Sequence, residues 1–298
     1  MTGTFEGRPI VVGIDGSDSA RRAARWAAAE AARRHTGLTL VTAVGAAAFS
    51  SAGGFVPPQG FFDELESQAR ALLAAAQAEV RETYPALEVQ VRLCAGGAAA
   101  VLLDESKLAA LVVLGSRDAE GGHLLMGGSV AVGLAAHGYC PTVVVRGVEV
   151  GGALPTGGPV VVGVDGSPAS ELAVALAFEE ASARGAELVA VHAWFEYGSG
   201  SIAQYVADWS FVESHEREVL AERLAGWQET YPDVTVRRVL SEDKAVRLLL
   251  SCAEGAQLLV VGNRGHGGFT GLLLGSTSRK LIHNAPCPLM VARPTESG

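Results

Sequence analysis

The stretch from Pro9 to Ala31 reads PIVVGIDGSDSARRAARWAAAEA. It returns from Pro159 to Ala181 as PVVVGVDGSPASELAVALAFEEA. Each copy opens on a short, valine-rich run, which is typical of a strand buried on both faces of a parallel sheet. A Gly-Ser turn follows, and then a segment whose alanines recur at helical spacing. The pattern predicts the same strand, turn and helix twice.

The repetition covers nearly the whole chain of 298 residues. Later repeated segments are ETYP at 82–85 and 229–232, and the pair CPTVVVR at 140–146 and CPLMVAR at 287–293. Between the copies lies a segment rich in glycine and proline, which is typical of a linker. We therefore predict two tandem domains, at residues 1–148 and 159–298, with a linker at 149–158.

Within each copy, apolar runs alternate with helical patterns. In the first copy the predicted strands are IVVGID, LTLVTAV, LEVQVRL, ALVVLGS and TVVVR. Strands that alternate with helices and connect through right-handed crossovers form a doubly wound α/β domain. Ligands of such domains bind beyond the carboxyl ends of the strands. We therefore expect the loops after the first, second and fourth strands to meet at one site.

Composition and charge argue against several classes of protein. The net charge is −9, which argues against a broad nucleic-acid-binding surface. No stretch of 18 residues consists only of uncharged apolar residues, and the N-terminus lacks the basic and apolar regions of a signal peptide. We expect a cytoplasmic protein that does not enter a membrane. Four cysteines form no CxxC pair and have no histidine at ligand spacing, so we expect buried free thiols at Cys94, Cys140, Cys252 and Cys287.

The second copy carries a glycine pattern directly after its fourth strand, in LLVVGNRGHGGFTGLLLGSTS at 258–278. The spacing is Gly262-x2-Gly265-x9-Gly275-Ser276. Gly262 suits a sharp turn and the close approach of a ligand. Gly265 is predicted to take a positive φ, which turns backbone N–H groups inward as an anion nest. From Gly275 onward a helix opens, where free N–H groups favour a phosphate and hydroxyls either bind phosphate or cap the helix.

Acidic and basic residues flank the same edge. Asp15 and Asp165 end the first strand of each copy, where a carboxylate either accepts a hydrogen bond from a ribose hydroxyl or an adenine amine, or caps the next helix. Arg264 and His266 flank the loop, where their charge would neutralise phosphate. For His266, a solvent-facing loop residue is the default interpretation, and a catalytic histidine is the less favoured alternative. No Ser/His/Asp or Cys/His set recurs in both copies, so we predict no catalytic residue.

Long aromatic segments follow the second strand of each copy, at 45–64 and 194–211. They either cover a bound base or pack on the rim of the sheet, and packing is the more frequent role. Neither a Walker A pattern nor GxGxxG after the first strand occurs. The glycine loop at the fourth strand is therefore the strongest indication of a ligand.

With these motifs, the sequence closely resembles the universal stress protein family in its tandem two-domain form. The resemblance rests on the VGIDGS and VGVDGS starts and on the complete G-x2-G-x9-G-[ST] pattern of the second copy. It implies binding of ATP, with Mg²⁺ on the nucleotide phosphates. The residues that it implies at ATP are Asp165 at the adenosine, the backbone near Ala193 at the adenine, and Gly262, Arg264, Gly265, Gly275, Ser276 and Thr277 around the phosphates.

The resemblance also implies an architecture. Each domain should be a Rossmann-like unit, similar to adenine nucleotide alpha hydrolases, with a five-stranded parallel sheet of order 3-2-1-4-5. The fifth strands, CPTVVVR and CPLMVAR, are expected to pair between the two domains of one chain. Two chains are further expected to associate as a homodimer.

The first copy departs from the motif at its centre, because Asp118 stands where the second copy has Gly265. Aspartate adopts left-handed backbone conformations less readily than glycine. Its charge would also repel a polyphosphate by about 1 kcal/mol or more, unless a cation bridges the two. We therefore predict two unequal sites, of which the second keeps the complete motif. The candidate residues of the first are Asp15, Val44, Gly115, Gly128 and Ser129.

The leading hypothesis is an ATP-binding stress-response module that senses or regulates. At most slow ATP hydrolysis is expected, since no placed general base or arginine finger is evident. One alternative is an enzyme of the related ATP-pyrophosphatase type, suggested by GIDGSDS at Gly13, a pattern that the second copy loses. The other alternative is a nucleotide-free assembly module.

Overall fold

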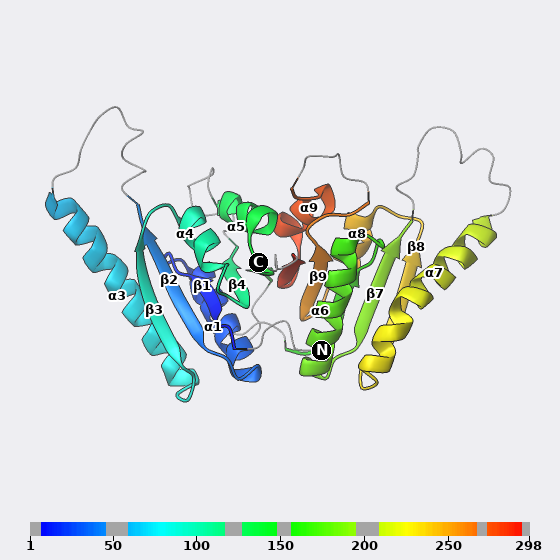
Figure 1. Ribbon diagram of the computed structural model, residues 1–298, viewed down its shortest axis with the longest axis horizontal. Coiled ribbons are helices and arrows are strands. Elements are labelled where there is room, and N and C mark those ends of the chain that lie inside the picture. The colour runs from blue at the N-terminus through cyan, green and yellow to red at the C-terminus, as the bar shows by residue number, and fades with distance from the viewer. Residues whose placement is uncertain are drawn as a thin grey trace, which may run out of the picture. The chain divides into compact units, whose positions relative to one another are not determined.

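The computed structural model describes residues 7–45, 59–116, 127–147, 156–194, 209–266 and 273–293. They form two compact units, whose boundary in the sequence lies between Arg146 and Gly147 (Figure 1). Most of the predicted linker lies outside the described residues, as do Asp118 and most of the two aromatic segments. No helix within the described ranges is long and apolar enough to span a membrane.

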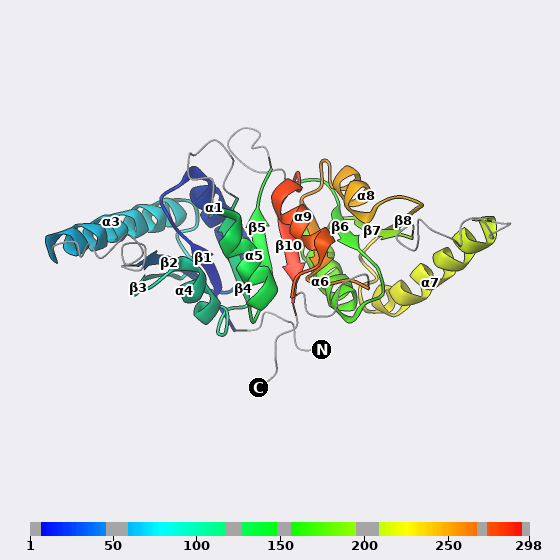
Figure 2. The same cartoon turned by 90° about the horizontal axis from the view of Figure 1, so that it is seen from above.

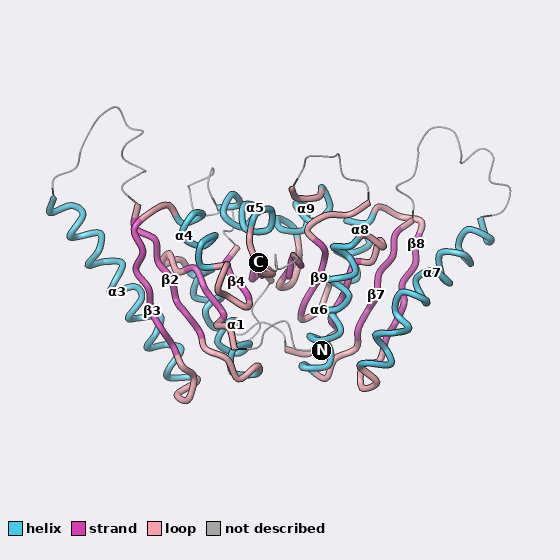
Figure 3. Tube along the Cα trace, in the orientation of Figure 1, coloured by secondary structure: helices cyan, strands magenta, loops and turns pink. Residues whose placement is uncertain are grey.

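The first unit alternates strands and helices along the chain, as the sequence predicts (Figure 3). Its elements are β1 (Ile10–Gly13), α1 (Asp18–Arg33), β2 (Leu38–Val44), α3 (Gln59–Thr83), β3 (Val89–Ala95), α4 (Ala98–Glu105), β4 (Leu111–Gly115), α5 (Gly127–His137) and β5 (Thr142–Val145). Its strands pair in parallel in the order β3-β2-β1-β4-β5. Helices α1 and α3 cover one face of this sheet, and α4 and α5 cover the other (Figure 2).

The second unit repeats this arrangement. Its elements are β6 (Val160–Gly163), α6 (Pro168–Arg184), β7 (Leu188–Ala193), α7 (Trp209–Thr230), β8 (Val236–Ser241), α8 (Ala245–Cys252), β9 (Leu258–Gly262), α9 (Ser276–Asn284) and β10 (Leu289–Ala292). The parallel strand order is β8-β7-β6-β9-β10. Both units therefore confirm the predicted doubly wound α/β fold and the order 3-2-1-4-5.

Each unit has its core on both sides of the central strands. Ile10, Val12, Val160 and Val162 expose no surface, because helices cover both faces of the sheet at these positions. Helix α1 packs on the sheet through small side chains, which let the helix approach closely. The alanines that the sequence places on one face of α1 are all buried: Ala20, Ala24, Ala27 and Ala31.

Helices α1 and α6 begin and end in similar ways. Ser17 and Ser167 cap their N-termini, each accepting a hydrogen bond from a backbone N–H at 3.2 Å. At their C-termini, two backbone N–H groups beyond the helix donate to carbonyls of its last turns, in an arrangement that requires one residue with a positive φ. Gly185 fills this position after α6 with φ 60°, and His35 fills it after α1 with φ 51°. Glycine takes this conformation readily, whereas a Cβ makes it unfavourable.

Replacing His35 by glycine is therefore expected to raise the free energy of unfolding by about 0.5–1 kcal/mol. The reverse change, Gly185→His, should lower the same quantity by a similar amount. Urea unfolding of the parent and of both variants measures the difference. A loss of stability in His35→Gly would show that the histidine side chain contributes more than its backbone strain costs.

Candidate nucleotide site

The candidate site of the second unit lies at the carboxyl ends of β6 and β9. Gly262 ends β9 and is buried. A Cβ at Gly262 would lie 2.7 Å from the carbonyl carbon of Ala169 and 2.8 Å from its oxygen, because the first turn of α6 packs against the end of the strand. Gly115, at the end of β4, meets the backbone of Ser19 in the same way. The first glycine of the motif is thus required for the packing of a helix against a strand.

Gly265 has a different role from the predicted one. Its φ is not positive, so the prediction of a left-handed glycine here is wrong. A Cβ at Gly265 would instead collide with Oδ2 of Asp165, the second residue after β6. Glycine is needed because the Asp165 carboxylate occupies the space that a side chain would take.

The Asp165 carboxylate joins the loop after β6 to the loop after β9. Its Oδ1 accepts a hydrogen bond from Ser167 N at 2.9 Å, and its Oδ2 accepts one from His266 N at 3.2 Å. The Ser167 hydroxyl also reaches across, donating to Arg264 O at 3.3 Å. Since Ser167 is the cap of α6, Asp165 does not serve as the helix cap. Asp15 makes the equivalent turn bond in the first unit, at 3.0 Å.

The N-terminus of α9 lies beside the same loop. Gly275 N donates to Asn263 O at 2.8 Å, which holds the start of α9 next to the end of β9. Gly275 is the N-cap and supplies no side-chain acceptor, which leaves N–H groups of the first turn suited to an external anion. Ser276 is exposed and Thr277 is half-buried. Ser278 is different, because its buried hydroxyl donates at 2.6 Å to the carbonyl that ends β9, so its role is structural.

The first unit contains a cavity of about 400 Å³ at the corresponding edge of its sheet. Three of the residues predicted for the first-unit nucleotide site line this cavity: Asp15, Val44 and Gly115. The wall that α3 contributes is largely apolar, and its Leu72 is 39% exposed. Leu72 lies 3.0 Å from the position of a Cβ on Gly16, so the side chain covers the turn after β1. A cavity of this volume lies within the usual range for small-molecule sites.

The other predicted residues of the first unit lie at the start of α5. Gly128 and Ser129 belong to its first turn, and the next residue, Val130, lines the cavity. Asp118 lies outside the described residues, so the effect of its charge stays a prediction. The described part of the first site is therefore a cavity with a carboxylate at its edge and the start of a helix beside it.

The ends of β2 and β7 lie at equivalent positions in the two units, each beside the candidate site of its own unit. Ala193 ends β7, and by the register of the sheets it corresponds to Ala43, while Trp194 corresponds to Val44. Both Ala43 and Val44 line the first-unit cavity. The predicted adenine contact near Ala193 thus lies at the end of β7. The equivalent end of β2 borders the cavity of the first unit.

Two polar pairs of the second unit have no counterpart at the equivalent positions of the first, in which Arg25 and Glu79 join α1 and α3 instead, at 2.9 Å. Nδ1 of His192 lies 2.6 Å from Val164 O, and its Nε2 lies 3.1 Å from Oε2 of Glu216. Arg223 of α7 donates to Glu171 of α6 at 2.6 Å. These residues were not among the predicted site residues, because the partners are far apart in the chain and no local pattern of residues predicts contacts of α7 with β7 or with α6.

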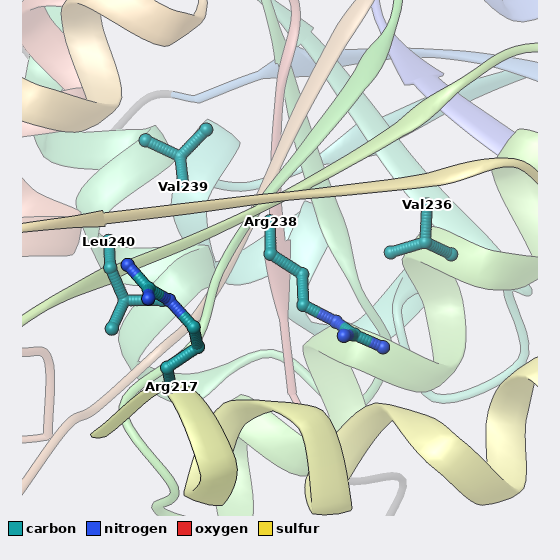
Figure 4. A pocket seen from close by; sticks show the side chains of 5 residues that line it. All are labelled: Arg217, Val236, Arg238, Val239 and Leu240. Atoms are coloured by element: carbon teal, nitrogen blue, oxygen red, sulfur yellow. The ribbon is translucent and has the colours of Figure 1, made fainter. Parts of the chain in front are cut away.

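A hollow of about 620 Å³ lies on α7 and β8 of the second unit. Figure 4 shows its lining side chains, Arg217 from α7 and Val236, Arg238, Val239 and Leu240 from β8. Both guanidinium groups have partners within the chain, since Arg217 donates to Glu213 at 2.6 Å and Arg238 to Gln228 at 3.0 Å. None of the predicted ATP-binding residues lines this hollow.

The four cysteines are free thiols, as the sequence predicts. Cys140 and Cys287 are buried, whereas Cys94 and Cys252 are only half-buried, so the prediction of burial is wrong for the latter two. Burial raises the pKa of the Cys140 thiol and that of the Cys287 thiol to about 12. Within the described residues, no group of three His, Cys, Asp or Glu could hold a metal ion.

Cys140 and Cys287 are expected to resist a thiol reagent such as 5,5′-dithiobis(2-nitrobenzoic acid) in the native protein at pH 8. The thiolate is the reactive form, and a pKa of about 12 leaves almost none of it at this pH. Cys94 and Cys252 should react first, and all four should react after unfolding in guanidinium. Rapid labelling of Cys140 or Cys287 without unfolding, located by mass spectrometry, would contradict this expectation.

Comparison with known proteins gives one consistent result. The model of the universal stress protein family matches residues 7–146 and again residues 158–293. Two relatives from Mycobacterium tuberculosis H37Rv, universal stress proteins Rv2623 and Rv2005c, are each 41% identical to this chain, over 95% of it and 96% of the relative. The crystal structure of a universal stress protein from Archaeoglobus fulgidus DSM 4304 matches with a TM-score of 0.72 and 18% identity, over 97% of this chain and 99% of that one. At this identity the structural match supports the fold alone.

Proposed function

Because the chain belongs to the universal stress protein family, we propose that it binds ATP in its second unit and acts as a regulatory module. The observation that carries the proposal is the Asp165 carboxylate, which lies against Gly265 and accepts a hydrogen bond from His266 N. A carboxylate here is suited to ribose hydroxyls. The adjoining loop and the start of α9 offer backbone N–H groups to phosphates. The cytoplasmic location and the association of two chains remain predictions from the sequence.

In the proposed complex, the adenine lies at the end of β7 near the backbone of Ala193, and the ribose lies at Asp165. The triphosphate then follows the loop after β9 toward the N-terminus of α9. Arg264 is exposed beside this loop and supplies positive charge. The proposed phosphate-binding residues are Gly262, Gly265, Gly275, Ser276 and Thr277.

Mg²⁺ is expected to arrive with the nucleotide. This ion usually keeps several waters and takes few protein ligands beside substrate phosphates. The described residues offer no cluster of three His, Cys, Asp or Glu, so the ATP phosphates would supply most of its ligands. When bound, the ion would offset the charge of the phosphates.

We propose regulation rather than rapid turnover, because phosphoryl transfer requires a residue that orients the nucleophile. None of the residues proposed to bind ATP is assigned this role. Calorimetric titration of the purified protein with Mg-ATP tests the proposal, and saturable binding is expected. Absence of binding would overturn it and favour the nucleotide-free assembly module. Release of pyrophosphate over many turnovers would instead favour an enzyme of the ATP-pyrophosphatase type.

The first-unit cavity supports a second, altered nucleotide site in the same chain, since Asp15 lies at its edge. Replacing Asp118 by glycine is expected to keep or raise the number of ATP molecules bound per chain. The change completes the glycine motif and removes a negative charge that would repel phosphates. Calorimetry of parent and variant at equal Mg²⁺ compares the two stoichiometries, and a lower value for the variant would contradict the prediction.

A further inference from the structure

The second unit carries a pair of side chains, His192 and Glu216, in the region that corresponds to the first-unit cavity. His192 corresponds to Thr42 by the register of the two sheets. Glu216 corresponds to Ala69, counting back along α3 and α7 from the repeated ETYP segment at which both helices end. Thr42 and Ala69 both line the first-unit cavity. The pair therefore introduces polar groups where the first unit has small side chains.

The position of His192 is set by the strand beside it. Nδ1 of His192 lies 2.6 Å from Val164 O, and the hydroxyl of Thr42 donates to the equivalent carbonyl, Ile14 O, at 2.9 Å. Since a carbonyl can only accept, Nδ1 carries a proton. The ring is thus held in a fixed orientation, with its other nitrogen directed at the carboxyl group on α7.

The second contact leaves one oxygen of Glu216 as an acceptor. Nε2 of His192 lies 3.1 Å from Oε2 of Glu216, so one proton lies between these two atoms, whichever group carries it. In either case Oε1 has no proton and can accept a hydrogen bond. The side chain of Glu216 is 29% exposed and that of His192 is 15% exposed, so a ligand can reach the pair.

The neighbouring wall of the second unit is also more polar than that of the first. Arg223 packs against Gly166 and donates to Glu171 at 2.6 Å. Over Gly16, the glycine that corresponds to Gly166, the first unit places the apolar Leu72 at 3.0 Å. The side of the site that α7 forms can therefore make hydrogen bonds, whereas the side that α3 forms mainly offers apolar contact.

We propose that Glu216, positioned by His192, selects the base of the nucleotide in the second unit. Its Oε1 accepts a hydrogen bond from the exocyclic amino group of adenine, so this site prefers an amino-bearing purine to the same purine without that group. Ala69 gives the first unit no such preference. The inference rests on the proposed function, because it presupposes a nucleotide in this site.

The test compares ATP with purine riboside triphosphate, which differs from ATP only in lacking the 6-amino group. Calorimetry in an Asp15→Ala background, chosen to weaken the first site, measures both affinities in the second unit. The Asp15→Ala protein, which is the parent for this comparison, is expected to bind purine riboside triphosphate about tenfold or more weakly than ATP. This is the effect of losing one hydrogen bond to a charged group. Glu216→Ala should lower the affinity for ATP to the same level and abolish the preference. His192→Thr, which introduces the residue of the first unit, should reduce the preference as well.

Glu213→Ala is the matched control, because it removes the same charge three residues earlier on α7 from a side chain that is 50% exposed. It should keep the preference for ATP. Equal affinities for the two nucleotides, or a preference that survives in both Glu216→Ala and His192→Thr, would overturn the inference and leave the proposed function standing. Failure of the parent to bind either nucleotide would overturn the proposed function itself.

Discussion

Replacing Gly265 by alanine is expected to weaken Mg-ATP binding by the second unit by about tenfold to a hundredfold. The new Cβ would collide with Oδ2 of Asp165, so the carboxylate must leave the position at which it accepts the hydrogen bond from His266 N. A hydrogen bond to a charged group contributes about 1.5–3 kcal/mol, and this is the interaction with the ribose that would be lost. Isothermal titration calorimetry measures the loss.

The backbone conformation of Gly265 makes the result of this substitution easier to interpret. Since its φ is not positive, alanine brings no left-handed strain, and the unit should remain folded. Gly226→Ala is the matched control, because a Cβ at this exposed position of α7 meets no atom within 4 Å. Parent-like affinity in Gly265→Ala would mean that Asp165 does not contact the nucleotide, and reduced affinity in Gly226→Ala would point to a general effect on folding.

Replacing Glu180 by alanine is expected to lower the free energy of unfolding by about 3–5 kcal/mol. Glu180 is fully buried in α6, and its Oε2 accepts a hydrogen bond at 2.9 Å from Nε of Arg184, whose side chain is only 5% exposed. Arg184 also donates to Gln257 at 3.4 Å. Without the carboxylate, the guanidinium charge would stay buried and would no longer be neutralised by its partner, which is costly in a region with little water.

Urea unfolding followed by circular dichroism measures this effect. Glu222→Ala on α7 is the control, since it removes an exposed glutamate and should change the free energy of unfolding by no more than about 0.5 kcal/mol. An equally small change in Glu180→Ala would show that the buried pair contributes little net stability.

Most of the fold could be predicted from the sequence, because it depends on local patterns. Valine-rich runs identified the strands, and LTLVTAV coincides with β2, Leu38–Val44. Burial holds for the central strands but not for β3, which lies at the end of the strand order and is largely exposed. The caps at Ser17 and Ser167 also follow from local residue preferences. The glycine motif begins at the end of β9, as its spacing predicts, yet the reason predicted for Gly265 was wrong, since its φ is not positive and Asp165 supplies the constraint.

Apolar periodicity and glycine spacing act over a few residues, so the sequence alone predicted two similar α/β units and a glycine loop after the fourth strand of the second. Which side chains meet at the carboxyl edge of each sheet depends on how the helices and loops pack there. Ser278 is structural while Ser276 is exposed, although the two are neighbours in one run of hydroxyls. His192 and Glu216 meet because α7 packs beside β7, and such a contact depends on how a helix docks on a sheet rather than on any pattern within either segment.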